Sequence, residues 1–242
     1  MSTNPSPLQL ARAFTVVSGG PLLLTLAAAT APLAAVRRWP SRAPAGAPRR
    51  TAWAATVAGL ALPWVYAGAV RPWLQHWGAT AEEQQRHLPS DLPDRPLSTT
   101  TRAVTVDATP EEVWRWLVQI GQDKGGFYSY DWLENLAGCR LRTATRVHPE
   151  WQDVHAGDPL TLFPGVGTRF TEVDPPHALV IEGWGAYVVE PNQDGTSRLL
   201  ARSHVDREPR ALAYYLGIEL PHAVMERRML LGIKERAEAH AL

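Results

Sequence analysis

Residues 99–121, TTTRAVTVDATPEEVWRWLVQIG, join a strand pattern directly to a helix start. Arg102 and Thr105 are interleaved with apolar residues, as is typical of a half-buried strand at residues 99–106. Thr109 is followed by a proline and, at the third helical position, by a glutamate, which is the pattern of a capping box. The stretch therefore predicts a strand followed at once by an amphipathic helix.

The next informative segment, residues 125–135 (GGFYSYDWLEN), places four aromatic rings and two carboxylates within nine residues. Such density suits the wall of a small-molecule site, because large rings supply contact area and a few polar groups fix orientation. It equally suits a short helix at residues 130–137 that packs its rings into a core. The residues alone leave both interpretations open.

Short β patterns occupy residues 141–206, where glycine, proline and Asp-Gly turn signals separate several of them. With the strand at residues 99–106 they predict about seven strands. The later ones are expected at residues 141–147, 159–163, 169–173, 179–183, 187–190 and 197–205.

A long amphipathic helix is predicted at residues 221–240. One apolar stripe can cover one face of a curved antiparallel sheet, so the order of elements predicts an α+β domain at residues 99–242, with two short helices after the first strand. Space left between a sheet and a single helix is the default ligand site. The face of the helix that would border this space carries His222, Met225, Glu226, Met229, Leu230, Ile233 and Ala237.

Two uncharged stretches precede this domain. Residues 13–36 and 51–70 are 24 and 20 residues long, and about 20 mostly apolar residues suffice to cross a bilayer. They predict two transmembrane helices that form a hairpin within residues 1–70. A small-residue site at residues 29–31 also fits a cleavable signal peptide in place of the first span.

The orientation of this hairpin follows from its loop. Residues 37–50 contain five arginines, and positively charged short loops stay in the cytoplasm. Both termini, and with them the C-terminal domain, are therefore expected outside the cytoplasm. Residues 71–98 contain four prolines among polar residues and predict a linker with a short helix at residues 80–87.

Composition argues against several classes of protein. The 24 basic and 24 acidic residues balance, so net charge gives no attraction to nucleic acid. Cys139 is the single cysteine, which excludes an internal disulfide. Because His148, His155 and His204 lack metal-ligand spacing and no nucleotide-binding fingerprint is present, we expect no metal, no cofactor and no nucleic-acid partner.

The run VDATPEEVWRWL at residues 106–117, followed by QIGQ, resembles the opening of SRPBCC proteins, the START-like, helix-grip superfamily that includes the polyketide cyclases. Similarity to a largely uncharacterised bacterial branch with N-terminal membrane spans rests on residues 126–135, 148–152 and 225–234. The resemblance covers roughly residues 98–242. It implies a helix-grip fold with a cavity between sheet and C-terminal helix. Many members bind lipids, sterols or other apolar molecules, and no common catalytic motif carries over.

The candidate site residues follow from these elements. Glu226 is either a cavity carboxylate with a raised pKa or one partner of an ion pair with an arginine such as Arg202 or Arg236. Asp131 and Glu134, one helical turn apart, could act as paired acids, although a carboxylate at Asp131 near the helix start is equally explained by the helix dipole. The side chains expected to bind ligand are Trp116, Phe127, Tyr128, Tyr130, Trp132, Trp184, Met225, Glu226 and Met229.

The preferred function is non-covalent binding of an apolar or lipid-like molecule by a membrane-tethered domain, with the bilayer as a partner. Two alternatives stay open. The domain could be a cyclase- or hydrolase-type enzyme that uses Glu226, Asp131 or Glu134 as weak catalytic candidates. It could also be a membrane-anchored protein-interaction module, and its protein partners are unknown.

Overall fold

The computed structural model describes residues 61, 64–91, 96–136, 138–205 and 214–240 of the 242 residues. The predicted span at residues 13–36 and most of the one at residues 51–70 lie outside this part. Among the residues that the structure describes, no helix has both the length and the apolar character needed to cross a bilayer.

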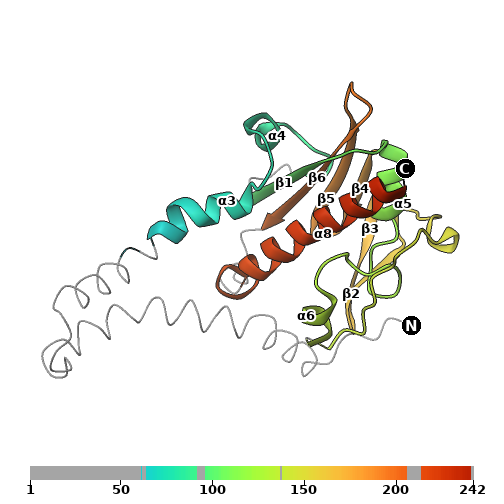
Figure 1. The fold of residues 1–242 in the computed structure, drawn as a ribbon. Helices are drawn as coiled ribbons and strands as arrows, with labels where there is room; N and C mark the ends of the chain where they lie inside the picture. Colours follow the sequence, from blue (N-terminus) through green and yellow to red (C-terminus); the bar gives the residue numbers. More distant parts are fainter. Residues whose placement is uncertain (1–60, 62–63, 92–95, 137, 206–213, 241–242) are drawn as a thin grey trace, which may run out of the picture.

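The domain is an α+β fold built on a six-stranded antiparallel sheet in the order β1-β6-β5-β4-β3-β2 (Figure 1). The chain thus runs up one edge, crosses to the far edge and returns strand by strand to pair with β1. The strands are β1 (Ser98–Val106), β2 (Pro159–Phe163), β3 (Val166–Asp174), β4 (Ala178–Ile181), β5 (Gly185–Pro191) and β6 (Ser197–Val205).

The prediction of a strand at residues 141–147 is wrong, because the backbone N–H groups of this segment bind acceptors outside the sheet. The N–H of Leu141 donates to Oδ1 of Asn135 at 2.7 Å, and that of Thr143 donates to Oδ2 of Asp131 at 2.9 Å. Ala144 donates to the carbonyl of Gly125 at 3.0 Å. This segment is therefore held to the preceding helix and loop, so the sheet has one strand fewer than expected.

One face of the sheet is covered by the long helix α8 (Glu219–His240), which follows the π-helical turn η3 (Tyr214–Ile218) (Figure 1). The short helices α5 (Pro110–Leu117) and α6 (Asp131–Leu136) and the turn η2 (Pro149–Trp151) complete the segments between β1 and β2. The Thr109 hydroxyl caps α5 by accepting from the N–H of Glu112, which is the first half of the predicted capping box; the Glu112 carboxylate accepts from Arg115 instead.

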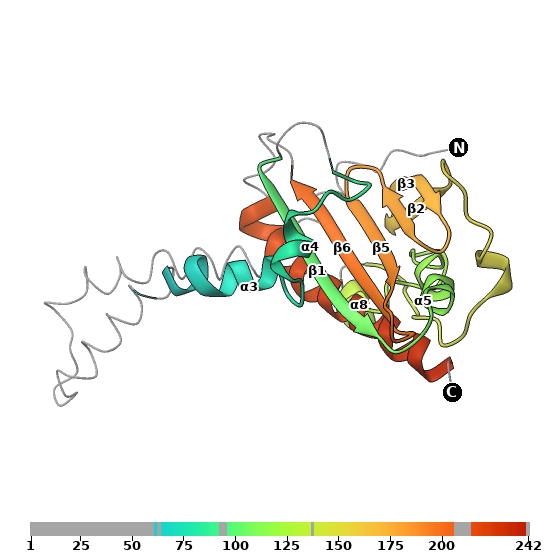
Figure 2. The ribbon, with the colours of Figure 1, turned by 90° about the horizontal axis from the view of Figure 1, so that it is seen from above.

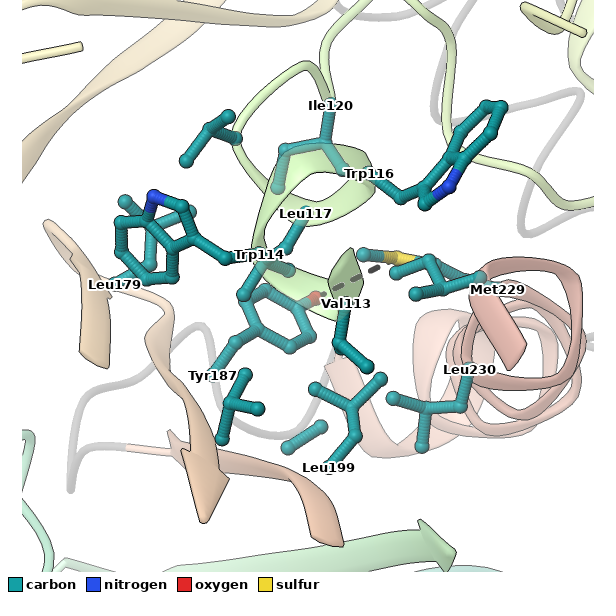
Figure 3. Packing of buried hydrophobic residues seen from close by; sticks show 14 of the residues in the cluster. Val113, Trp114, Trp116, Leu117, Ile120, Leu179, Tyr187, Leu199, Met229 and Leu230 are labelled. Atoms are coloured by element: carbon teal, nitrogen blue, oxygen red, sulfur yellow. Dashed lines mark hydrogen bonds between the residues drawn. The ribbon is translucent and has the colours of Figure 1, made fainter. Parts of the chain in front are cut away.

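The main core lies between α8, α5 and the sheet (Figure 3). Leu230 and Ile233 of α8 are fully buried there, together with Leu117 of α5 and Leu199 of β6. Apolar burial of this kind is the main source of stability. It fixes the C-terminal half of α8 firmly against the sheet.

The opposite face of the sheet is covered by residues 78–91, part of the segment that we predicted as a linker (Figure 2). This segment contains α4 (Ala81–Gln85), which starts with a complete capping box at Thr80. The chain before it forms η1 (Tyr66–Val70) and α3 (Arg71–Gln75). Leu88 adds to a second apolar cluster with β-strand residues on this face.

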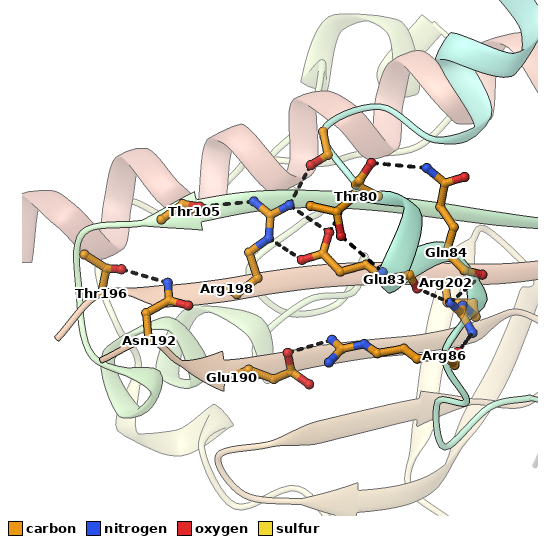
Figure 4. A network of polar contacts seen from close by, with 12 residues as sticks. Thr80, Glu83, Gln84, Arg86, Thr105, Glu190, Asn192, Thr196, Arg198 and Arg202 are labelled. Carbon is orange, nitrogen blue, oxygen red and sulfur yellow. Dashed lines mark hydrogen bonds and ion pairs between the residues drawn. The ribbon is translucent and has the colours of Figure 1, made fainter. Parts of the chain in front are cut away.

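Arginines of β6 bind this covering segment (Figure 4). Arg198 pairs with Glu83 at 2.7 Å, and Arg202 donates to the carbonyls of Glu83 and Arg86 and pairs with Asp91. Because these guanidinium groups are held by main-chain oxygens as well as carboxylates, the segment is fixed in position on the sheet.

Candidate ligand-binding cavity

A cavity of about 530 Å³ lies between the sheet, α6 and the first turns of α8. This volume falls within the usual range for small-molecule sites, about 300–1,000 Å³. Its wall is mostly aliphatic, aromatic and sulfur-containing. The wall's polar side chains are Ser129, Glu134, Tyr187, His222 and Glu226.

Of the side chains predicted to bind ligand, five lie on this wall. They come from three separate parts of the chain: the loop before α6, the turn between β4 and β5, and α8. The five are Phe127, Trp184, Met225, Glu226 and Met229, and the catalytic candidate Glu134 lies on the wall with them.

The other four predicted ligand-binding side chains lie away from the wall. Trp116 and Tyr128 are buried in the core, where the Tyr128 hydroxyl donates to the Trp116 carbonyl at 3.1 Å. Trp132 is 68% exposed on the outer side of α6, and Tyr130 is half-buried just before that helix. The aromatic segment thus contributes one ring, that of Phe127, to the cavity.

The backbone at Tyr128 decides which rings reach the cavity. Tyr128 has a φ of 54°, and its hydroxyl accepts from Nε2 of Gln119 at 2.8 Å. Gly232 of α8 packs directly against it, since a Cβ at Gly232 would lie 2.3 Å from the Tyr128 carbonyl oxygen. The Ser129 hydroxyl donates to the Met225 carbonyl at 3.2 Å. Two successive residues of this loop, Tyr128 and Ser129, are therefore in contact with α8.

Glu226 is one partner of a fully buried ion pair, and the other is Arg102 of β1. His222 lies 3.3 Å away, and the hydroxyls of Tyr187 and Ser203 donate to the carboxylate at 3.5 Å. Burial alone would raise the pKa of Glu226, but Arg102 and His222 lower it to about 2. Glu226 is therefore ionised and stabilised by its neighbours.

The expectation that Arg202 or Arg236 would pair with Glu226 is wrong. Arg102 is opposite Ala201 across β1 and β6, whereas Arg202 is opposite Thr101. Cross-strand partners share a face and successive residues alternate, so Arg102 and Arg202 lie on opposite faces of the sheet. Arg236 donates to the carbonyls of Ala144 and Gly232.

Glu134 presents the opposite situation. It is only 5% exposed, and neither of its carboxyl oxygens has a hydrogen-bond partner among the described residues. Burial, and secondly the nearby charge of Asp131, raises its pKa to about 7. Cys139 lies beside it on the wall, and burial raises the pKa of this thiol to about 11. The cavity thus contains a carboxyl group that the protein leaves uncompensated.

Asp131, the proposed partner of Glu134 in an acid pair, does not line the cavity. Its two oxygens accept from the backbone N–H and the hydroxyl of Thr143. Asp131 therefore serves to hold the segment after α6 in place.

His222 was placed on the cavity-facing side of the last helix by the sequence interpretation but was not named as a site residue. It lines the cavity, and its Nδ1 lies 2.8 Å from the Tyr214 hydroxyl. Its position four residues before Glu226 on one helical face was the available signal. The partner Arg102 gave no signal, because it is a single charge in a strand. Within the described part of the chain, no cluster of three or more His, Cys, Asp or Glu side chains could hold a metal ion.

Comparison with known proteins adds little. No family model and no curated protein matches the chain. Among solved structures, one similar chain is a protein from Arthrobacter aurescens determined by solution NMR. It shares 15% identity at a TM-score of 0.33, over 63% of this chain and 92% of its own.

Proposed function

We propose that this protein binds a hydrophobic or lipid-like small molecule in the cavity between the sheet and α8, as a membrane-tethered domain of the helix-grip, SRPBCC-like type. The observation that carries the proposal is the apolar cavity of about 530 Å³. The space is partly open to the surface, so a guest molecule can enter it. A space of this size with an apolar wall is suited to an apolar guest.

The tether is part of the proposal. Residues 64–75 are helical throughout, and α3 points away from the sheet (Figures 1 and 2). Trp64 and Trp73 on this stretch are 79% and 56% exposed, and indole rings favour the headgroup region of a bilayer. Glu219, in the first turn of α8, binds both Arg71 and Gln75 of α3. The same turns of α8 line the cavity, so a ligand site and a membrane-proximal helix would be neighbours.

An enzymatic role has less support. Asp131 is bonded to Thr143, and Glu226 is paired with Arg102. A carboxylate with a pKa of about 2 is a weak base at neutral pH. Glu134, with a pKa of about 7, is the candidate that suits a general acid or base.

Native mass spectrometry of the full-length protein in a mild non-ionic detergent tests the binding proposal. A matched pair of variants on α6 gives the control: Leu133→Trp places a large ring in the cavity wall, whereas Leu136→Trp places it on an exposed position. We expect wild type and Leu136→Trp to take up apolar small molecules, and Leu133→Trp to lose most of that uptake. Absence of any uptake by wild type, or equal uptake by all three, would refute the proposal.

Localisation needs a separate test. Two spans with a positively charged loop between them would place the C-terminal domain outside the cytoplasm. A reporter fused after Leu242 and active only outside the cytoplasm should therefore be active. Activity of a cytoplasm-specific reporter at the same site would overturn this arrangement.

A further inference from the structure

Glu134 is the starting point, because it is a buried carboxyl group on the cavity wall that lacks a hydrogen-bond partner among the described residues. Leaving a buried polar group without a partner is unfavourable, and more so for a charged one. Its helix neighbour Asp131 binds Thr143, whereas Glu134 binds no side chain in the described part of the chain. A hydrogen-bond donor on a bound molecule would give the buried Glu134 carboxyl group the partner that it lacks and so offset the cost of its burial.

The other polar oxygens of the wall have partners, and Nε2 of His222 faces the Glu226 carboxylate at 3.3 Å. Glu226 accepts from Arg102, Tyr187 and Ser203. The Ser129 hydroxyl donates to a main-chain carbonyl. A ligand that carries one polar group therefore finds its free acceptor at Glu134.

The charge of the wall restricts the ligand further. No Lys or Arg lies among the cavity-lining residues. An anionic head group such as a fatty carboxylate would lie in an apolar space that already contains Glu134 and Glu226, without a cation of its own. A neutral or cationic hydrogen-bond donor is not repelled by these two carboxyl groups.

We propose that the cavity selects apolar molecules that carry a hydrogen-bond donor, a hydroxyl or an amine, and that the Glu134 carboxyl group receives this donor. The inference rests on the proposed function, since it names the class of ligand for the same cavity. Apolar contact supplies affinity, and Glu134 supplies orientation and selectivity.

Four probes with the same ten-carbon chain separate apolar binding from selection of a hydrogen-bond donor. They are 1-decanol, decylamine, 1-methoxydecane and decanoate. Their dissociation constants are measured by calorimetry at pH 8.5, above the pKa of about 7 of Glu134, so that its carboxylate can only accept. The full-length protein is held in amphipol, with protein-free amphipol as the blank. We expect decanol and decylamine to bind about tenfold more tightly than methoxydecane, which accepts but cannot donate. Decanoate should bind most weakly. Decanol against decylamine shows which donor is preferred.

Variants assign the selectivity to the carboxyl group. Glu134→Leu should bind methoxydecane at least as well as wild type and lose the preference for decanol. Glu134→Gln keeps an acceptor oxygen and should retain the preference for decanol while losing that for decylamine. Glu172→Leu removes an exposed carboxylate of β3 and should behave as wild type.

The outcomes distinguish the two proposals. If no probe binds wild type, the proposed function fails and this inference fails with it. If all probes bind wild type equally, or if Glu134→Leu keeps the preference, the cavity binds apolar molecules but Glu134 does not select them. Circular dichroism confirms folding of each variant, and Glu134→Gln, which keeps the size and polarity of the side chain, decides the matter if Glu134→Leu does not fold.

Discussion

Replacing Glu134 by Gln should change how the stability of the ligand-free protein depends on pH. Burial raises the pKa of this carboxyl group from 4.5 to about 7, with a second contribution from Asp131. One pKa unit corresponds to about 1.4 kcal/mol. Ionising Glu134 therefore costs the folded state about 3 kcal/mol relative to the unfolded chain.

The sign of the effect follows from proton binding. Below about pH 4.5 the carboxyl group is protonated in both states, and the favourable contribution is fully present. As the pH rises towards 7, the folded state keeps a proton that the unfolded chain has released, so the free energy of unfolding falls. Above about pH 7 the group is ionised in both states and the loss is complete. Glu134→Gln has no such group and does not suffer this loss.

The assay is urea unfolding of the full-length protein in a non-ionic detergent at several values between pH 4.5 and 8, followed by tryptophan fluorescence. We expect the unfolding free energy of Glu134→Gln, minus that of wild type, to grow by about 3 kcal/mol across this range. Glu172→Gln, a change at an exposed carboxylate, is the control and should show a flat difference. A flat difference for Glu134→Gln as well would mean that the carboxyl group is solvated or paired, and it would refute the reasoning.

Three further changes test the buried ion pair, a close backbone contact and a helix cap, each by urea unfolding at pH 7. Glu226→Gln should lower the free energy of unfolding by about 3–5 kcal/mol, because it leaves Arg102 buried without its counter-charge; a loss below 1 kcal/mol would contradict the buried pair. Gly232→Ala should cost about 1–3 kcal/mol, since the new methyl group meets the backbone of Tyr128, and an unchanged midpoint would show that the two segments are not in close contact. Thr109→Ala should lower the free energy of unfolding by about 1 kcal/mol through loss of the helix cap. An unchanged free energy of unfolding would show that the Thr109 hydroxyl does not stabilise α5.

Features that depend on local chemistry were predicted well from the sequence. The strands at residues 159–163 and 197–205 begin and end where expected, and α8 begins two residues before its predicted start. Their signals lie within each segment: alternation for strands and helical spacing for α8. Residues 141–147 show the limit of such signals. Their pattern suits a strand, but side chains of α6 bind the backbone donors that a neighbouring strand would need.

The site was harder to predict, because its composition depends on contacts between distant segments. Phe127 and Trp132 have similar apolar character, yet one faces the cavity and the other faces solvent. The turn at Tyr128, held by its contact with Gly232, determines which of the two rings faces the cavity. Tyr128 and Gly232 are about a hundred residues apart in the sequence, so no local pattern reveals this contact. In the same way, the choice of Arg102 as the partner of Glu226 follows from the register of β1 on β6.

The cavity itself is explained by where the large side chains are used. Trp116 and Tyr128 pack together at 6.0 Å between ring centroids, and Trp116 also contacts His240 near the end of α8. These rings fill the space beneath the C-terminal half of the helix. Near its first turns the wall carries aliphatic and sulfur-containing side chains such as Met225 together with the rings of Phe127 and Trp184, which border the space, and Trp132 is directed to solvent. The same helix is thus closely packed at one end and leaves a cavity at the other, where the ion pair of Glu226 holds it to the sheet without filling the space. An apolar ligand bound there would make the contacts with the cavity wall that no side chain of the protein makes. The Glu134 carboxyl group would favour ligands that carry a hydrogen-bond donor.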